Sequence, residues 1–194
     1  MRDKKEIVLS NINNLWVSYL GRMIIIKDKV VGDNLSFTVD KNGIVSGKFS
    51  NINSSDNTVE DYLTALCHEL GHMIYNKFVD GINIPKLHLT KREKFKRLIL
   101  ELTCDIFAVR IVTSVLGLKY SPEFVKIDSD YNKSYFNLGY PTVNERLLFM
   151  SKACITSSDI ISLGMKYIPK EMNSYFKGDK DSIVFIDTII RDFC

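Results

Sequence analysis

His68 and His72 are the residues whose types and spacing most directly indicate chemistry in this chain. They enclose Glu69 in the pentapeptide HELGH, residues 68–72. Helical positions four apart lie on one face, so both imidazoles can reach one metal ion. Glu69 directly follows His68 on the predicted helix. Its carboxylate can therefore lie beside the metal and act as general base on a metal-activated water without being a ligand. The pattern predicts a zinc-hydrolase centre, and two histidines at a coincidental spacing are the alternative.

A pair of acidic residues further along the chain predicts the third metal ligand. Glu101 and Asp105 are four residues apart in LILELTCDIFAVRIV, where most of their neighbours are apolar. Buried carboxylates are costly unless they are paired or bind a metal. We therefore expect Glu101 to be the third ligand of Zn²⁺, and Asp105 to accept the N–H of a ligand histidine and so fix its tautomer. A buried salt bridge to Arg97 or Arg110 is the alternative.

The other residue types that bind metals give weaker patterns. His88 lies in PKLHLT, which we interpret as a loop, so we expect it to be solvated. The four cysteines include no Cys-x-x-Cys pair, and we expect free thiols. Cys67 and Cys104 flank the two motifs and are expected to be small buried packing residues. The predicted ligand set is therefore His68, His72 and Glu101.

The surrounding sequence predicts the elements that must position these residues. Apolar residues at helical spacing predict a helix from Asp3 to Leu20 that ends at Gly21. A turn at 40–43 and strand-like patterns predict a small antiparallel sheet from 23–31, 33–39 and 44–51. Two long helices are expected at about 58–78 and 90–116, the second opened by a capping box at TKRE. Shorter helices are expected after Ser121, from Pro141, and near 158–167 and 181–193.

This order of elements is an α+β pattern. No repeat or linker divides the chain, so we expect one domain, 1–194, with the sheet and HExxH helix within about 1–80 and a helical part from about 81 to 194. The net charge of +3 gives no reason to expect nucleic acid or an anionic membrane as a partner. The N-terminus is not a convincing signal peptide, and no apolar run is long enough to span a membrane. We therefore expect a cytoplasmic protein.

HELGH followed by Glu-x-x-x-Asp resembles the gluzincin metallopeptidases. Within them it looks most like the group of the CAAX prenyl proteases, the HtpX heat-shock proteases and the small soluble minigluzincins. The resemblance covers about residues 33–150, and it includes DIFAVRI and YPTVNERLLFM as counterparts of later family motifs. It implies a zincin-like fold, with a small antiparallel sheet packed on the active-site helix and a helical C-terminal subdomain. It also implies a zinc-dependent endopeptidase whose partner is a protein or peptide substrate.

The resemblance implies three further site residues. Tyr140 stands where the family has a histidine that steadies the oxyanion; its hydroxyl is also a donor, and a packing aromatic is the alternative. Arg146 keeps the place of the family's arginine and would brace the site or help to polarise substrate, or else form a salt bridge within the helical subdomain. The run 44–51 corresponds to the outer strand that holds substrate by β-augmentation. Gly47 in this run would let a substrate backbone approach closely.

Two alternative functions stay open. The first is a repressor-cleaving regulatory protease of a phage or mobile element, acting in a bacterium or a phage-infected host, because such proteases also carry HELGH and a downstream glutamate. The second is a zinc-stabilised binding protein with little or no catalysis. Glu69 argues against the second, since a structural site needs no base, whereas the substitution at Tyr140 keeps it open. The C-terminal segment DSIVFIDTIIRDFC is expected either to pack as a helix or to cover the cleft as an inhibitory segment.

Overall fold

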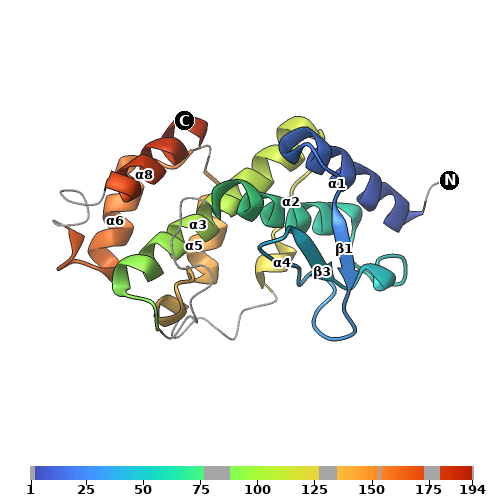
Figure 1. The fold of residues 1–194 in the computed structure, drawn as a ribbon, viewed down its shortest axis with the longest axis horizontal. Helices are drawn as coiled ribbons and strands as arrows, with labels where there is room; N and C mark the ends of the chain where they lie inside the picture. Colours follow the sequence, from blue (N-terminus) through green and yellow to red (C-terminus); the bar gives the residue numbers. More distant parts are fainter. Residues whose placement is uncertain (1–2, 77–87, 127–134, 153, 173–179, 194) are drawn as a thin grey trace. The chain divides into compact units, whose positions relative to one another are not determined.

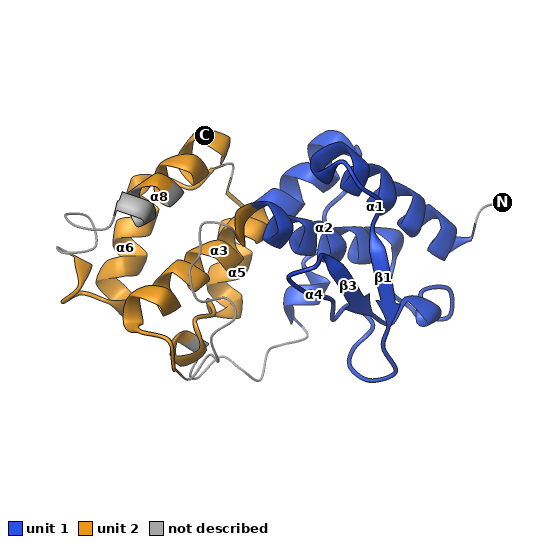
Figure 2. Cartoon of the chain, viewed as in Figure 1, with its two compact units in different colours: residues 1–74, 107–127 blue, residues 75–106, 128–194 orange. Residues whose placement is uncertain are grey.

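The computed structural model describes residues 3–76, 88–126, 135–152, 154–172 and 180–193. This part of the chain is mostly helical and contains one three-stranded sheet, which confirms the α+β class (Figure 1). Two compact units are present (Figure 2): Met1–Ile74 with Phe107–Ile127, and Tyr75–Ile106 with Asp128–Cys194. The first unit thus includes a segment that the sequence analysis placed in the C-terminal part. The single-domain assignment stays a prediction.

The first unit begins with α1 (Lys4–Leu20), as predicted. The side chain of Asp3 accepts the backbone N–H of Glu6 and caps the start of the helix, while Gly21 ends it with a φ of 65°. A left-handed residue of this kind is the common way to satisfy the last carbonyls of a helix, and glycine adopts it without steric cost. One face of α1 is buried, and it consists of Val8, Ile12, Leu15 and Trp16.

The sheet of the first unit is mixed, with the strand order β1-β3-β2. Its strands are β1 (Ile25–Asp28), β2 (Thr38–Val39) and β3 (Ile44–Gly47). β2 is antiparallel to β3 across the predicted turn, but β1 is parallel to β3, so the prediction of an antiparallel sheet is wrong for this pair. The connection from β1 to β3 runs through β2, and it provides the length that a parallel pair needs. Alternation in a sequence predicts strands, but it does not specify their partners.

β3 is the central strand of the sheet, so its assignment as the outer strand is wrong. Its two edges are paired with β1 and β2, and a peptide can add only to an edge that is not already paired. This removes the reason for expecting substrate at Gly47. A Cβ atom at Gly47 would overlap the ring of Phe37, which in turn contacts the rings of Phe49 and Tyr62 at centroid distances of 5.2 and 6.2 Å. Gly47 therefore allows the sheet to pack closely against the helix that carries Tyr62.

Replacing Gly47 with Ala is expected to lower the free energy of unfolding by about 1–3 kcal/mol, because the added methyl group overpacks the site. Urea unfolding measures the change. If the overlap with Phe37 is the cause, the same substitution should be less destabilising in a Phe37→Leu background. Equal destabilisation in both backgrounds would show that the cause lies elsewhere.

The two long helices that the sequence predicted are present, as α2 (Val59–Tyr75) and α3 (Lys91–Arg110). The capping box is confirmed at the start of α3: the Thr90 N–H donates to Oε2 of Glu93 at 2.7 Å, and the Glu93 N–H donates to Oγ1 of Thr90 at 3.3 Å. α3 continues into the π-helical turn η4 (Ile111–Val115), and Gly117 follows with a φ of 65°. The predicted end of α2 near residue 78 lies outside the described residues.

The shorter predicted helices are confirmed as α4 (Glu123–Lys126), α5 (Val143–Met150), α6 (Ser157–Tyr167) and α8 (Lys180–Phe193). The C-terminal segment thus packs as a helix, with Ile186 and Ile189 buried, and the Tyr75 hydroxyl donates to Asp192 at 3.4 Å. An inhibitory role for this segment stays a prediction.

Glu145 connects α5 to α6 within the second unit. Its carboxylate accepts hydrogen bonds from Nζ of Lys166 at 2.7 Å and from the hydroxyl of Tyr167, which lies 2.7 and 2.8 Å from its two oxygens. Burial alone would raise the pKa of Glu145, but these bonds and one from the Thr142 backbone outweigh it and lower the pKa. Burial and the same carboxylate raise the pKa of Tyr167 to about 12.

Replacing Tyr167 with Phe is therefore expected to lower the free energy of unfolding at pH 7 by about 1–2 kcal/mol, since a hydrogen bond to a charged group is lost. A carboxyl whose folded pKa is lowered contributes stability above its unfolded pKa, and this contribution is lost as the pH falls through the folded pKa. The loss of unfolding free energy caused by Tyr167→Phe should therefore be smaller in acid. Urea unfolding of the wild type and the variant at pH 7 and near pH 3 measures this difference. Tyr120→Phe is the matched control, with an expected change within about 0.5 kcal/mol. An effect of Tyr167→Phe that does not vary with pH would contradict this account.

Candidate metal centre

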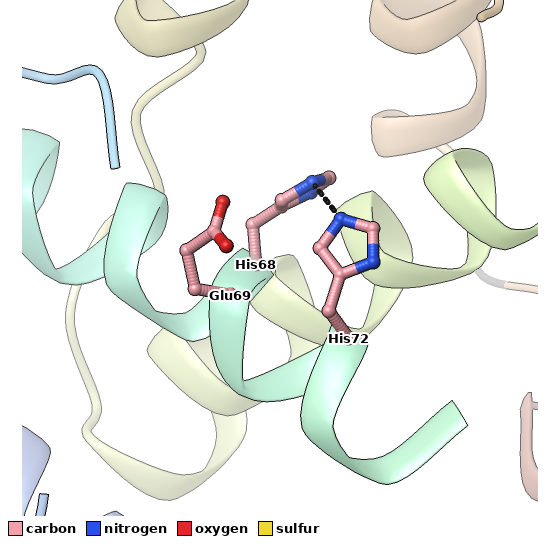
Figure 3. Close-up of side chains that lie close together, drawn as sticks. All are labelled: His68, Glu69 and His72. Carbon is pink, nitrogen blue, oxygen red and sulfur yellow. Dashed lines mark hydrogen bonds between the residues drawn. The ribbon is translucent and has the colours of Figure 1, made fainter. Parts of the chain in front are cut away.

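His68, Glu69 and His72 come together on α2 as the sequence predicted. Nε2 of His68 lies 3.1 Å from Nε2 of His72, and Figure 3 shows the three side chains projecting from the same side of the helix, with the His68 ring directed toward His72. One ligand atom from each of the three residues lies within 4.8 Å of the others. These three side chains therefore form a group that could hold a metal ion.

The group occupies a mainly buried stretch of α2. His68 and Glu69 are 5% and 8% exposed, whereas His72 is half-buried. Leu66, Cys67 and Leu70, which are fully buried, surround them in the sequence. Polar side chains in such an environment are unfavourable unless they have polar partners or a ligand. Of the three residues, His72 alone is partly exposed.

The separation of the imidazole nitrogens fits a shared zinc ion. Two nitrogens that each lie about 2.0–2.1 Å from one ion in a tetrahedral arrangement are about 3.3 Å apart, close to the observed 3.1 Å. An N–H···N hydrogen bond between two neutral imidazoles has a similar length, so the distance suits both uses. Imidazole nitrogens suit first-row transition metals, Zn²⁺ among them, better than Ca²⁺ or Mg²⁺, which prefer oxygen ligands alone.

Glu101 and Asp105 lie on α3 in the second unit. Their predicted burial is confirmed, because they are 6% and 0% exposed. The two histidines belong to the first unit, and the role of Glu101 as the third ligand stays a prediction. The same holds for the predicted hydrogen bond between Asp105 and a ligand histidine.

Asp105 forms a bidentate salt bridge with Arg146, which lies on α5. Nε of Arg146 donates to Oδ2 at 2.8 Å and Nη2 donates to Oδ1 at 2.6 Å. The salt bridge that the sequence analysis considered for Arg146 is therefore present, and Asp105 is its partner. For Asp105 itself only Arg97 and Arg110 had been considered. They are its neighbours along α3, whereas Arg146 is 41 residues away.

The remaining predicted residues have simpler surroundings. Tyr140 is half-buried just before α5, and its oxyanion role stays a prediction. His88 is exposed, as predicted. Cys67 and Cys104 are buried and are not in disulfide bonds, as predicted, and burial raises the pKa of Cys67.

Phe124 is a residue of the site that the sequence analysis missed. Its ring lies against that of His68, with a centroid distance of 5.5 Å and an interplanar angle of 56°. Phe124 belongs to the short helix α4 of the first unit. A single aromatic residue in a four-residue helix carries no sequence signal for this contact, because the two residues are far apart along the chain.

Compared with known protein families, curated proteins and solved structures, the chain matches none. The resemblance to the gluzincins therefore rests on the motif residues. Among the described residues, no helix combines the length and the apolar character needed to cross a bilayer.

Proposed function

We propose that this protein is a zinc-dependent endopeptidase of the gluzincin type, with a zincin-like fold. One observation carries the proposal: the Nε2 atoms of two imidazoles lie 3.1 Å apart on a mainly buried helix, and one ligand atom from each of His68, Glu69 and His72 lies within 4.8 Å of the others. His68 and His72 would be zinc ligands, and Glu101 would complete the set. The proposal places the protein in the cytoplasm of a bacterium or a phage-infected host, with proteins or peptides as substrates.

Zinc, when bound, would lower the pKa of a water molecule to about 7 and polarise the scissile carbonyl. Glu69 would accept a proton from the attacking water and donate it to the leaving amine. Its adjacent position on α2 allows this without ligation. The hydroxyl of Tyr140 would donate to the developing oxyanion, and Asp105, fixed by Arg146, would orient a ligand imidazole.

The presence of Glu69 favours a hydrolase over a structural zinc site. Structural sites are closed by four protein ligands and need no general base. The Glu69 carboxylate is 8% exposed, and one of its oxygens belongs to the group of ligand atoms that lie within 4.8 Å of one another, which supports a role as proton acceptor. A peptide that adds to the sheet would do so at β1 or β2, because both edges of β3 are already used.

Cleavage of a diverse peptide library by protein purified without added zinc tests the proposal. We expect cleavage that a zinc chelator abolishes and that Zn²⁺, but not Mg²⁺, restores. Cleavage that is insensitive to chelator would contradict the zinc mechanism. A zinc-loaded protein that cleaves no member of the library would contradict the peptidase assignment.

A further inference from the structure

We propose that Phe124 is a positioning residue, which holds the imidazole ring of His68 in the orientation that brings its Nε2 atom to that of His72. The inference rests on the proposed function and deepens it, because it assigns to α4 a part in building the metal site. It is carried by two independent contacts between the α4 segment, residues 121–126, and α2, both within the first unit.

The first contact anchors the α4 segment to the histidine-bearing face of α2. The backbone N–H of Ser121 donates to Oγ1 of Thr64 at 3.0 Å, and the same hydroxyl donates to the carbonyl oxygen of Glu60 at 2.7 Å. Thr64 is fully buried, so its hydroxyl depends on these partners. Thr64, His68 and His72 follow one another at intervals of four residues and therefore lie along one face of the helix. The segment is thus attached one helical turn before His68.

The second contact is between the rings. The ring centroids of Phe124 and His68 are 5.5 Å apart, with an interplanar angle of 56°. Those of His72 and His68 are 4.8 Å apart, with an interplanar angle of 80°. The rings of Phe124 and His68 are tilted and those of His68 and His72 are T-shaped, both at distances that aromatic pairs favour. The imidazole of His68 therefore has one ring neighbour on α4 and another on α2. Val125, next to Phe124, is fully buried and fixes α4 in the core of the unit.

These contacts have a direct consequence for metal binding. The terminal torsion of a histidine side chain is broad and roughly two-fold, so the ring is not fixed by its own rotamer preference. Removing the Phe124 ring would let the imidazole rotate and turn Nε2 away from His72. We expect Phe124→Ala to weaken zinc binding about tenfold, at the lower end of the range for partners that orient metal ligands.

The test compares Phe124→Ala with Phe124→Tyr, which keeps the ring, and with Val125→Ala, which truncates the buried neighbour. Zinc dissociation constants come from competition with a chromophoric chelator, and thermal melts confirm that each variant is folded. We expect the tenfold weakening in Phe124→Ala alone, and affinities within about twofold of the wild type in the other two. Wild-type affinity in Phe124→Ala, or equal weakening in Val125→Ala, would overturn the inference.

A second measurement separates this inference from the proposed function. In the metal-free protein, we expect the same pattern of nuclear Overhauser contacts between the ring protons of His68 and His72 in the wild type and in Phe124→Tyr, and a different pattern in Phe124→Ala, because rotation of the ring exchanges the places of its Nε2 and Cε1 atoms. If the pattern is unchanged in Phe124→Ala, Phe124 does not position the ring, whether or not zinc binds. If the contacts follow this expectation but the wild type binds no zinc, the proposed function fails and the positioning role stands.

Discussion

Replacing Glu69 with Gln is expected to lower kcat/KM for peptide cleavage by about 10²–10⁴-fold, the usual contribution of a general base, while the protein keeps its zinc. Glutamine has nearly the same shape as glutamate but cannot accept the proton of the attacking water. Metal binding should be unchanged because the proposed ligands are His68, His72 and Glu101. Steady-state cleavage assays, with zinc content measured on the same samples, give the two quantities.

Glu60→Gln is the matched control for this substitution. Glu60 lies on the same helix and is half-buried. Its backbone carbonyl accepts a hydrogen bond from the hydroxyl of Thr64, and this contact does not involve its side chain. We expect activity within about twofold of the wild type, because no step of general acid–base catalysis is assigned to its side chain. Undiminished cleavage by Glu69→Gln would exclude Glu69 as the base, and loss of zinc from that variant would show that it acts in metal binding.

Replacing Asp105 with Ala is expected to lower the free energy of unfolding by about 3–5 kcal/mol. Asp105 is fully buried, and the side chain of Arg146 is only 11% exposed. Without its carboxylate partner the guanidinium loses two short hydrogen bonds in a position that water reaches poorly. Urea unfolding measures the change. Glu123→Ala breaks an exposed pair with Lys126 and should cost less than about 1 kcal/mol.

The double variant Asp105→Leu/Arg146→Met separates stability from metal binding. Replacing both charges with apolar groups should recover most of the lost stability, because no charge is left unpaired. If Asp105 also orients a ligand histidine, this variant should still bind zinc about 10-fold more weakly than the wild type. If the double variant binds zinc as tightly as the wild type, Asp105 acts only in the salt bridge and does not orient a ligand histidine. A cost below about 1 kcal/mol for Asp105→Ala alone would contradict the importance of the salt bridge.

The features that the sequence predicted correctly depend on residues close together in the chain. Asp3 and Gly21 bound α1, and Thr90 with Glu93 opens α3, because capping involves only the first or last helical turn. The meeting of the His68 and His72 nitrogens is equally local, since it follows from a four-residue interval on one helix.

The features that could not be predicted depend on pairs that are distant in the chain. The parallel pairing of β1 with β3 depends on the path of the chain between the two strands. The alternation of apolar and polar residues within each strand does not specify that path. The same is true of the bond between Arg146 and Asp105 and of the ring contact between Phe124 and His68. In each case the sequence indicates what one partner is, but many other segments or residues of the chain could have been the second partner.

A zinc titration of the purified protein tests the central claim most directly, namely that His68 and His72 hold one metal ion. The account predicts one zinc per chain for the wild type and for His88→Ala, which removes an exposed histidine elsewhere in the chain. It predicts affinities reduced by more than about 100-fold in His68→Ala and His72→Ala, beyond the range for residues that only orient ligands. If either variant binds zinc as tightly as the wild type, or if the wild type binds none, the account is contradicted.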